Sequence, residues 1–139
     1  MSTEEKIALH LTTLSPEKSA ALSRLYQLIL MEMSSSDLQF FDGKNEEGKV
    51  VTNPTIGFGK SRIHYAKGSF QDTFRIGICA TSTGLSIYIL GLEDKKFLQD
   101  FLGDRLGKAK ITGYAISFKK MSDIDESVLR ELIRIVTEQ

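Results

Sequence analysis

The hydrophobic and polar positions of the chain change period along its length, and the changes mark out helices and strands. Apolar residues recur every three or four positions in 16–33, which predicts a helix with one buried face. Ser15 can cap that helix and Pro16 suits its first position. A shorter helix is expected at 4–11, and a last helix should begin at Asp125, whose side chain can serve as its cap.

Between these helices, polar and apolar residues alternate or β-branched and aromatic residues gather, which is typical of strands. The strands expected on this basis are 38–41, 50–52, 61–65, 73–80, 85–90 and 114–118. We expect 61–65, 73–80 and 85–90 to pair as a three-stranded antiparallel core. An amphipathic helix is expected at 94–102. The order of elements favours an α+β fold over a regularly alternating, doubly wound sheet.

The composition predicts a single domain, and together with the start of the chain it predicts a cytoplasmic protein. The chain has 139 residues, 41% hydrophobic and 26% charged, which is ordinary for one globular domain. Lys plus Arg equals Asp plus Glu at 18 each, so nucleic acid and anionic lipid are not expected as partners. We expect a cytoplasmic protein, because the start carries Glu4, Glu5 and Lys6 in place of an apolar signal segment, and Cys79 is the single cysteine.

Several segments together resemble a known family in order and spacing. They are PTIGFG (54–59), HYAKG (64–68), LSIYI (85–89), LGKAK (106–110) and KKMSDID (119–125). The chain resembles, over 54–133, the YdhG-like family of small bacterial domains of unknown function. The resemblance implies one α+β domain over 1–139, with a mainly antiparallel sheet and helices packed on one side. Ala109 and Ile111 depart from the family, which often has a histidine and further polar residues there.

The strongest candidate for a binding surface is a run of alternating cations. Lys60, Arg62 and His64 should point to the same face of one strand, because strand side chains alternate. If Lys108 and Lys110 approach that face, the five groups would surround an anion, either a small molecule or part of a protein partner. The alternative is a solvated polar face of the sheet.

Other motifs point to no catalytic residue, so we expect a binding or interaction domain in place of an enzyme. Gly59-Lys60-Ser61 is not expected to form a phosphate loop, because Pro54 stands where the first glycine is required and a strand follows. His10 is expected at the surface, and the thiol of Cys79 is expected to be buried.

Iron is the one alternative cofactor, and otherwise no cofactor is expected. Some YdhG-like proteins are described as frataxin-like iron chaperones, so the resemblance implies an iron-binding chaperone as the alternative function. Carboxylates could supply the hard oxygen ligands, in the groups 4–5, 46–47, 93–94 and 123–126, if the fold brought two groups together. Each group also has a local explanation, as a helix start or a solvated loop.

Overall fold

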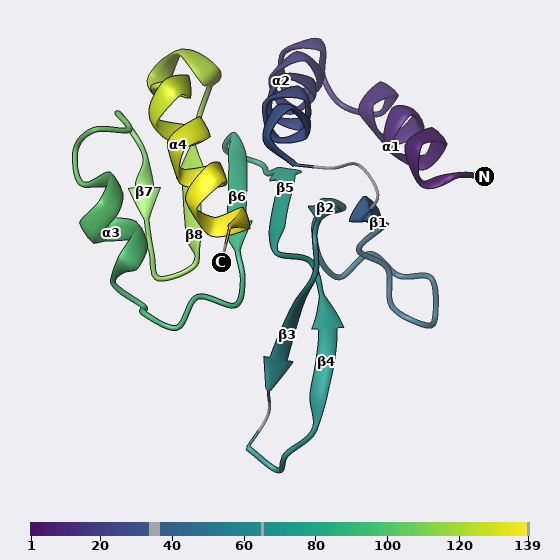
Figure 1. The fold of residues 1–139 in the computed structure, drawn as a ribbon. Coiled ribbons are helices and arrows are strands. Elements are labelled where there is room, and N and C mark those ends of the chain that lie inside the picture. Colours follow the sequence, from purple (N-terminus) through teal and green to yellow (C-terminus); the bar gives the residue numbers. More distant parts are fainter. Residues whose placement is uncertain (34–36, 65, 139) are drawn as a thin grey trace.

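The computed structural model describes residues 1–33, 37–64 and 66–138, and it shows an α+β fold (Figure 1). The helices in the described part are α1 (Thr3–Thr12), α2 (Pro16–Glu32), α3 (Phe97–Leu102) and α4 (Glu126–Thr137), with a short 3₁₀ helix at Met121–Asp123. The predicted helices at both ends of the chain are confirmed. Ser15 accepts a hydrogen bond from the Lys18 N–H, and Asp125 caps α4. The expected helix 94–102 is shorter, because residues 94–96 form a turn before it.

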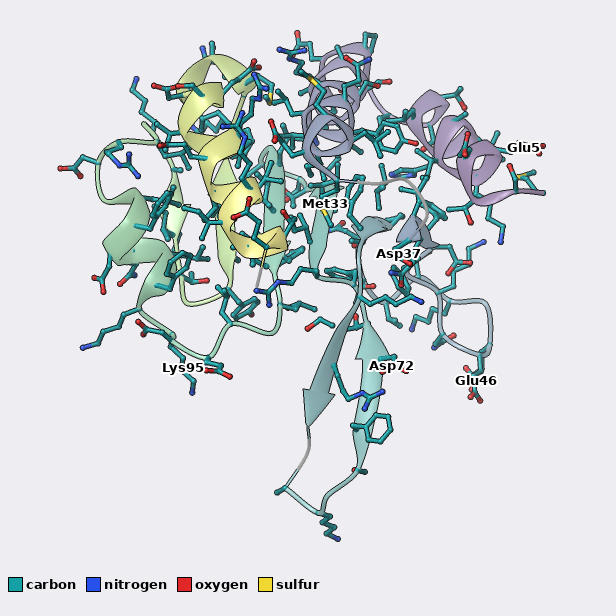
Figure 2. All side chains as sticks on the ribbon, in the orientation of Figure 1. Glu5, Met33, Asp37, Glu46, Asp72 and Lys95 are labelled. Atoms are coloured by element: carbon teal, nitrogen blue, oxygen red, sulfur yellow. The ribbon has the colours of Figure 1, made fainter. Side chains whose placement is uncertain are left out.

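The strands form a six-stranded antiparallel sheet and a separate pair. Their bounds are β1 (Gln39–Phe41), β2 (Thr55–Phe58), β3 (Ser61–His64), β4 (Phe70–Thr73), β5 (Ile76–Ala80), β6 (Leu85–Ile89), β7 (Lys110–Ile111) and β8 (Ala115–Phe118). The order in the large sheet is β1-β2-β5-β6-β8-β7, while β3 pairs with β4 alone. In Figure 1 the β3–β4 hairpin projects away from the body of the molecule, and Asp72 marks it in Figure 2.

The predicted three-stranded core is wrong in its pairing. Segment 73–80 breaks at Phe74 and Arg75, so that β4 lies in the projecting hairpin and β5 lies in the sheet. The partners of β5 are β6 and β2, a strand that the sequence analysis did not predict. Of the two glycines in segment 54–59, Gly59 has the positive φ of a turn, at 70°, while Gly57 is extended within β2. No strand forms at 50–52, where Val50 makes an isolated bridge with Lys44.

One face of the large sheet carries a continuous apolar row. The residues that lie opposite one another across the six strands are Phe40, Ile56, Ile78, Ile87, Ile116 and Ile111. Helices α2 and α4 lie over this face (Figure 1), and Leu22, Leu25 and Leu132 from them are fully buried. Burial of apolar area on this face is the main source of stability, because each Å² of apolar surface removed from water stabilises the folded state by about 25 cal/mol.

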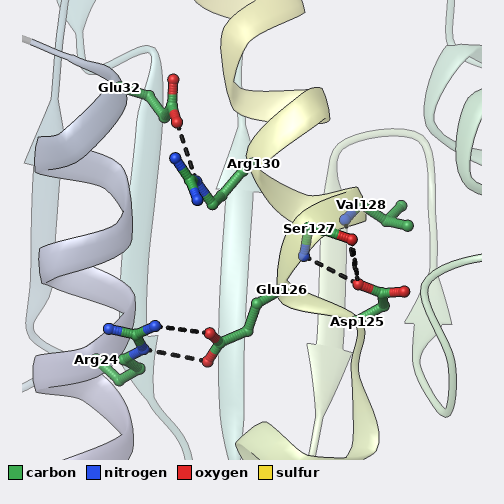
Figure 3. Close-up of polar contacts among 7 residues, drawn as sticks. All are labelled: Arg24, Glu32, Asp125, Glu126, Ser127, Val128 and Arg130. Atoms are coloured by element: carbon green, nitrogen blue, oxygen red, sulfur yellow. Dashed lines mark hydrogen bonds and ion pairs between the residues drawn. The ribbon is translucent and has the colours of Figure 1, made fainter.

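Ion pairs join the two helices that cover the sheet (Figure 3). Arg24 of α2 donates two hydrogen bonds to Glu126 of α4, at 3.2 and 2.8 Å. Near the other end of α2, Glu32 accepts from Arg130 at 3.0 Å and from Arg134 at 2.8 Å.

No helix of the described chain has the length and apolar character that crossing a bilayer requires.

Candidate functional site

The projecting hairpin holds two of the predicted anion-binding cations, and each has a carboxylate beside it. Arg62 Nε lies 3.0 Å from Asp72 Oδ1, and the guanidinium stacks 3.9 Å from the centre of the Phe70 ring. Lys60, in the turn before β3, lies 3.6 Å from Asp37 Oδ1. The side chain of His64 lies outside the described part of the structure. Both described cations are therefore already compensated by neighbouring negative charge.

The other two predicted cations lie at the opposite edge of the sheet. Lys110 is in β7, paired with Ser117, and β6 and β8 separate it from β5. The Lys108 N–H donates to the Asp123 carbonyl, which places it in the loop before β7. The hairpin continues instead from β2 and β5, so the structure does not bring Lys108 and Lys110 to Lys60 and Arg62 (Figure 1).

A different surface has the shape of a ligand site. A groove of about 680 Å³ lies between α1, β1 and the loop that follows β1, and we call it the amino-terminal groove. Its volume falls within the range of about 300–1,000 Å³ that is usual for small-molecule sites. Its lining residues are Met1, Lys6, Leu9, His10, Thr13, Phe40, Phe41, Asp42, Gly43, Lys44, Val51 and Thr52.

The walls of the amino-terminal groove are unusually apolar for a surface. Eight large apolar side chains of the described chain are exposed, and four of them line this groove. These four are Met1 at 75% exposure, Leu9 at 55%, Phe41 at 41% and Val51 at 59%. Single exposed apolar residues are common, but a concentration of them in one concavity marks a binding surface. No sequence pattern pointed to this groove, because Leu9, Phe41 and Val51 lie in segments expected only to form a helix at 4–11 and strands at 38–41 and 50–52.

The groove is lined by two lysines, Lys6 and Lys44, and by one carboxylate, Asp42. Among the described residues, neither Lys6 nor Lys44 forms an ion pair with a carboxylate. Asp42 also lines the groove, and its Oδ1 accepts the backbone N–H of Lys44 at 2.9 Å. An anionic group placed near the two lysines would therefore meet cations that form no direct ion pair with a described carboxylate, with Asp42 as the one acidic residue of the lining.

His10 also lines this groove and is only partly exposed, so its predicted surface position holds only in part. Its ring packs against Phe40, with the ring centres 5.5 Å apart. Its Nε2 is buried and has no hydrogen-bond partner in the described residues. Burial lowers the pKa of His10 from its usual value, because the charged imidazolium loses hydration. The ring therefore acts as a neutral, mainly apolar part of the wall.

The other candidates of the sequence analysis have structural roles. Cys79 is fully buried, as predicted, and burial raises the pKa of its thiol. No group of three or more His, Cys, Asp or Glu side chains gathers in metal-binding geometry within the described ranges. Asp125 caps α4 and Glu126 pairs with Arg24, so these two carboxylates are occupied in the helix interface.

In comparisons with known proteins, no protein-family model, no curated protein and no solved structure matches the chain. The resemblance to the YdhG-like family, and the iron-binding alternative that comes with it, therefore stay predictions. The candidate site rests on the geometry and charge of the amino-terminal groove.

Proposed function

We propose that this chain is a binding domain whose amino-terminal groove takes a small amphipathic anion. The apolar body of the ligand would lie on Leu9, Phe41 and Val51, and its carboxylate would lie between Lys6 and Lys44. The observation that carries the proposal is the gathering of half of the exposed large apolar side chains of the described chain in one groove. Lys6 and Lys44, which also line this groove, supply the charge complementarity that selects an anion.

The volume of the groove favours a small molecule over a protein partner. A stable protein–protein interface buries roughly 800 Å² on each side and is usually flat. A concavity of about 680 Å³ with an apolar lining and a few polar groups has the composition of a small-ligand site. The Lys60 and Arg62 surface is a weaker candidate for the same ligand class, because Asp37 and Asp72 would compete with the incoming anion.

Isothermal titration with octanoate tests the proposal, because octanoate has an apolar chain and one carboxylate. We expect saturable binding that weakens when salt is raised, since screening acts on exposed lysines. Octanamide, which has the same chain without the charge, should bind several-fold more weakly. Lys6→Ala combined with Lys44→Ala should weaken octanoate binding by about tenfold, whereas the matched removal of two lysines by Lys108→Ala and Lys110→Ala should leave it unchanged.

The same titration distinguishes the two surfaces. Loss of octanoate binding in Arg62→Ala, with full binding retained in the Lys6 and Lys44 double variant, would place the anion on the hairpin and contradict the groove. Equal binding of octanoate and octanamide to all variants would remove the electrostatic part of the proposal. A Leu9→Ser variant tests the apolar part, and it should weaken both probes, because the chain of each would lose the same contact.

A further inference from the structure

The face of the sheet that lies opposite α2 and α4 has an unusual composition. Neighbouring residues across this face are Gly57, Gly77, Tyr88 and Ala115 in one row, and Cys79, Ser86 and Ser117 in the next. A solvent-facing side of an antiparallel sheet normally carries polar and charged side chains. Here the floor is made of small residues instead, and aromatic rings stand over it.

The aromatic rings are held by specific contacts. The Phe74 ring occupies the space that a Cβ atom on Gly77 would take, and a Cβ atom on Gly57 would meet Cβ and Cγ of Phe74 at 2.9 and 3.3 Å. On the other side of the face, Tyr88 stacks with Tyr114, with ring centres 6.3 Å apart and planes 23° from parallel. The small residues therefore form the bottom of a depression in the sheet face. Phe74 forms one side of it, and the Tyr88–Tyr114 pair forms the other.

A slot of about 450 Å³ opens between these walls. Its lining residues are Thr52, Asn53, Thr55, Phe74, Cys79 and Tyr88, and we call it the sheet-face slot. None of these side chains carries a formal charge at neutral pH, since burial raises the pKa values of both Cys79 and Tyr88. The slot offers hydroxyl groups and one side-chain amide as hydrogen-bonding groups, and aromatic faces as stacking surfaces.

We propose that the sheet-face slot binds a small, uncharged, planar ligand that carries an amide or a similar hydrogen-bonding group. Planarity follows from the walls, because Phe74 and Tyr88 present rings that favour stacked or edge-to-face contacts with another ring. Neutrality follows from the lining, because a charged ligand would lose hydration there without gaining an opposite charge. Asn53 and the hydroxyls of Thr55 and Tyr88 would hydrogen-bond the amide.

This inference is independent of the proposed function. The amino-terminal groove and the slot share Thr52 alone among their lining residues, and they differ in charge. The groove has two lysines and selects an anion, whereas the slot has no charged side chain and selects a neutral ring. Either site can therefore exist without the other, and probes of matched shape and different charge distinguish them.

Three related probes test the slot by NMR titration of ¹⁵N-labelled protein. Benzamide is planar and neutral, benzoate has the same ring with a charge, and cyclohexanecarboxamide keeps the amide without the flat ring. We expect benzamide to bind with a Kd of about 1 mM, as is usual for so small a fragment, and to shift the amide signals of β2, β5 and β6. Benzoate and cyclohexanecarboxamide should each bind at least about threefold more weakly.

Cys79 provides a second readout, because it is the only cysteine and lies at the floor of the slot. Alkylation of the buried thiol by iodoacetamide requires local opening, so an occupant should slow it. At benzamide concentrations of ten times Kd, the rate should fall about tenfold. Phe74→Leu should weaken benzamide about three- to tenfold, and Leu9→Ser in the groove should leave benzamide binding unchanged.

Each contrary result overturns the inference. Absence of shifts at about ten times the expected Kd would show that the slot takes no neutral ring. Benzamide shifts confined to α1 and the loop after β1 would assign the probe to the groove. Protection of Cys79 that rises with protein concentration in the absence of benzamide would show that a second copy of the chain covers this face. Full benzamide affinity in folded Phe74→Leu protein would remove the aromatic wall.

Discussion

At the scale of single residues, two glycines shape the middle of the sheet. Gly57 of β2 lies opposite Gly77 of β5, and the side chain of Phe74 fills the space above both. Glycine within a strand usually costs stability, because it adds flexibility and packs nothing. Here the cost is offset by the aromatic ring that covers the bare backbone, an arrangement known to stabilise designed sheets.

Gly77→Ala should therefore destabilise the protein. Its Cβ would overlap the Phe74 ring, so the ring must leave its position, and overpacking of this kind costs about 1–3 kcal/mol. Urea denaturation followed by circular dichroism measures the change in the free energy of unfolding. Combining Gly77→Ala with Phe74→Leu should give a smaller loss than the sum of the single changes. Strict additivity in this double-mutant cycle would show that the ring and the glycine do not interact.

Among the elements, the β3–β4 hairpin stands apart from the six-stranded sheet. Its two strands pair only with each other, and none of their described residues belongs to the buried apolar cluster. A two-stranded hairpin alone is only marginally stable in water. Its side-chain contacts include an ion pair and a cation–π stack within the hairpin, together with the Lys60–Asp37 pair at its base.

We expect the domain to fold without this hairpin. Replacing 62–72 by a short glycine-containing turn should change the midpoint of thermal unfolding by less than about 5 °C, since the apolar core keeps all its described members. Circular dichroism melting of the shortened protein checks this. Loss of the cooperative transition would mean that the hairpin guides the pairing of β2 with β5.

The first turn of α4 depends on its cap. Asp125 Oδ1 accepts the Ser127 N–H at 2.9 Å and the Ser127 hydroxyl at 2.6 Å, and these bonds lower the pKa of the Asp125 carboxyl. Asp125→Ala should lower the thermal midpoint by a few degrees, because the first N–H groups of the helix lose their acceptor. Asp125→Asn should lower it less, since the amide oxygen still caps. Equal midpoints for the two variants would show that charge, and not the cap, is what matters.

At the scale of the whole molecule, ion pairs fasten the two covering helices across the sheet. Hydrogen bonds from Arg134 and Arg130 lower the pKa of Glu32, and a hydrogen bond from Arg24 lowers the pKa of Glu126. When the pKa of a carboxyl group is lower in the folded chain, the unfolded chain takes up its proton first as pH falls. This contribution to stability is therefore complete at neutral pH and is lost progressively below about pH 5.

Glu32→Gln should flatten the acid side of the stability profile. The variant should be less stable than the parent at pH 7, and the difference should shrink as the pH approaches 3, where Glu32 of the parent is increasingly protonated. Urea midpoints at several pH values measure this, with Glu46→Gln in the solvated loop as the matched control. A constant difference between parent and Glu32→Gln across that range would assign the effect to packing.

The local features of this protein can be predicted from residues that are close together in the chain. The helix over 16–32, the cap at Asp125, the burial of Cys79 and the α+β class all follow from residues within a few positions of one another. Helical periodicity and capping bonds act over three or four residues, so their signals are complete in the chain itself. The two helices at the ends of the chain were predicted for this reason.

Which distant segments meet depends on the folding of the whole domain and could not be predicted from the chain alone. In the structure β2 pairs with β5, and 61–64 lies in a separate hairpin. The chain alone did not show this pairing, because an extended glycine such as Gly57 cannot be told from a turn glycine by residue type. Likewise, the chain alone did not show that Asp37 and Asp72 neutralise Lys60 and Arg62, or that α1 and the loop after β1 enclose a groove. Contacts such as Arg24 to Glu126 join residues 102 positions apart, and they form only when the complete core brings their elements together.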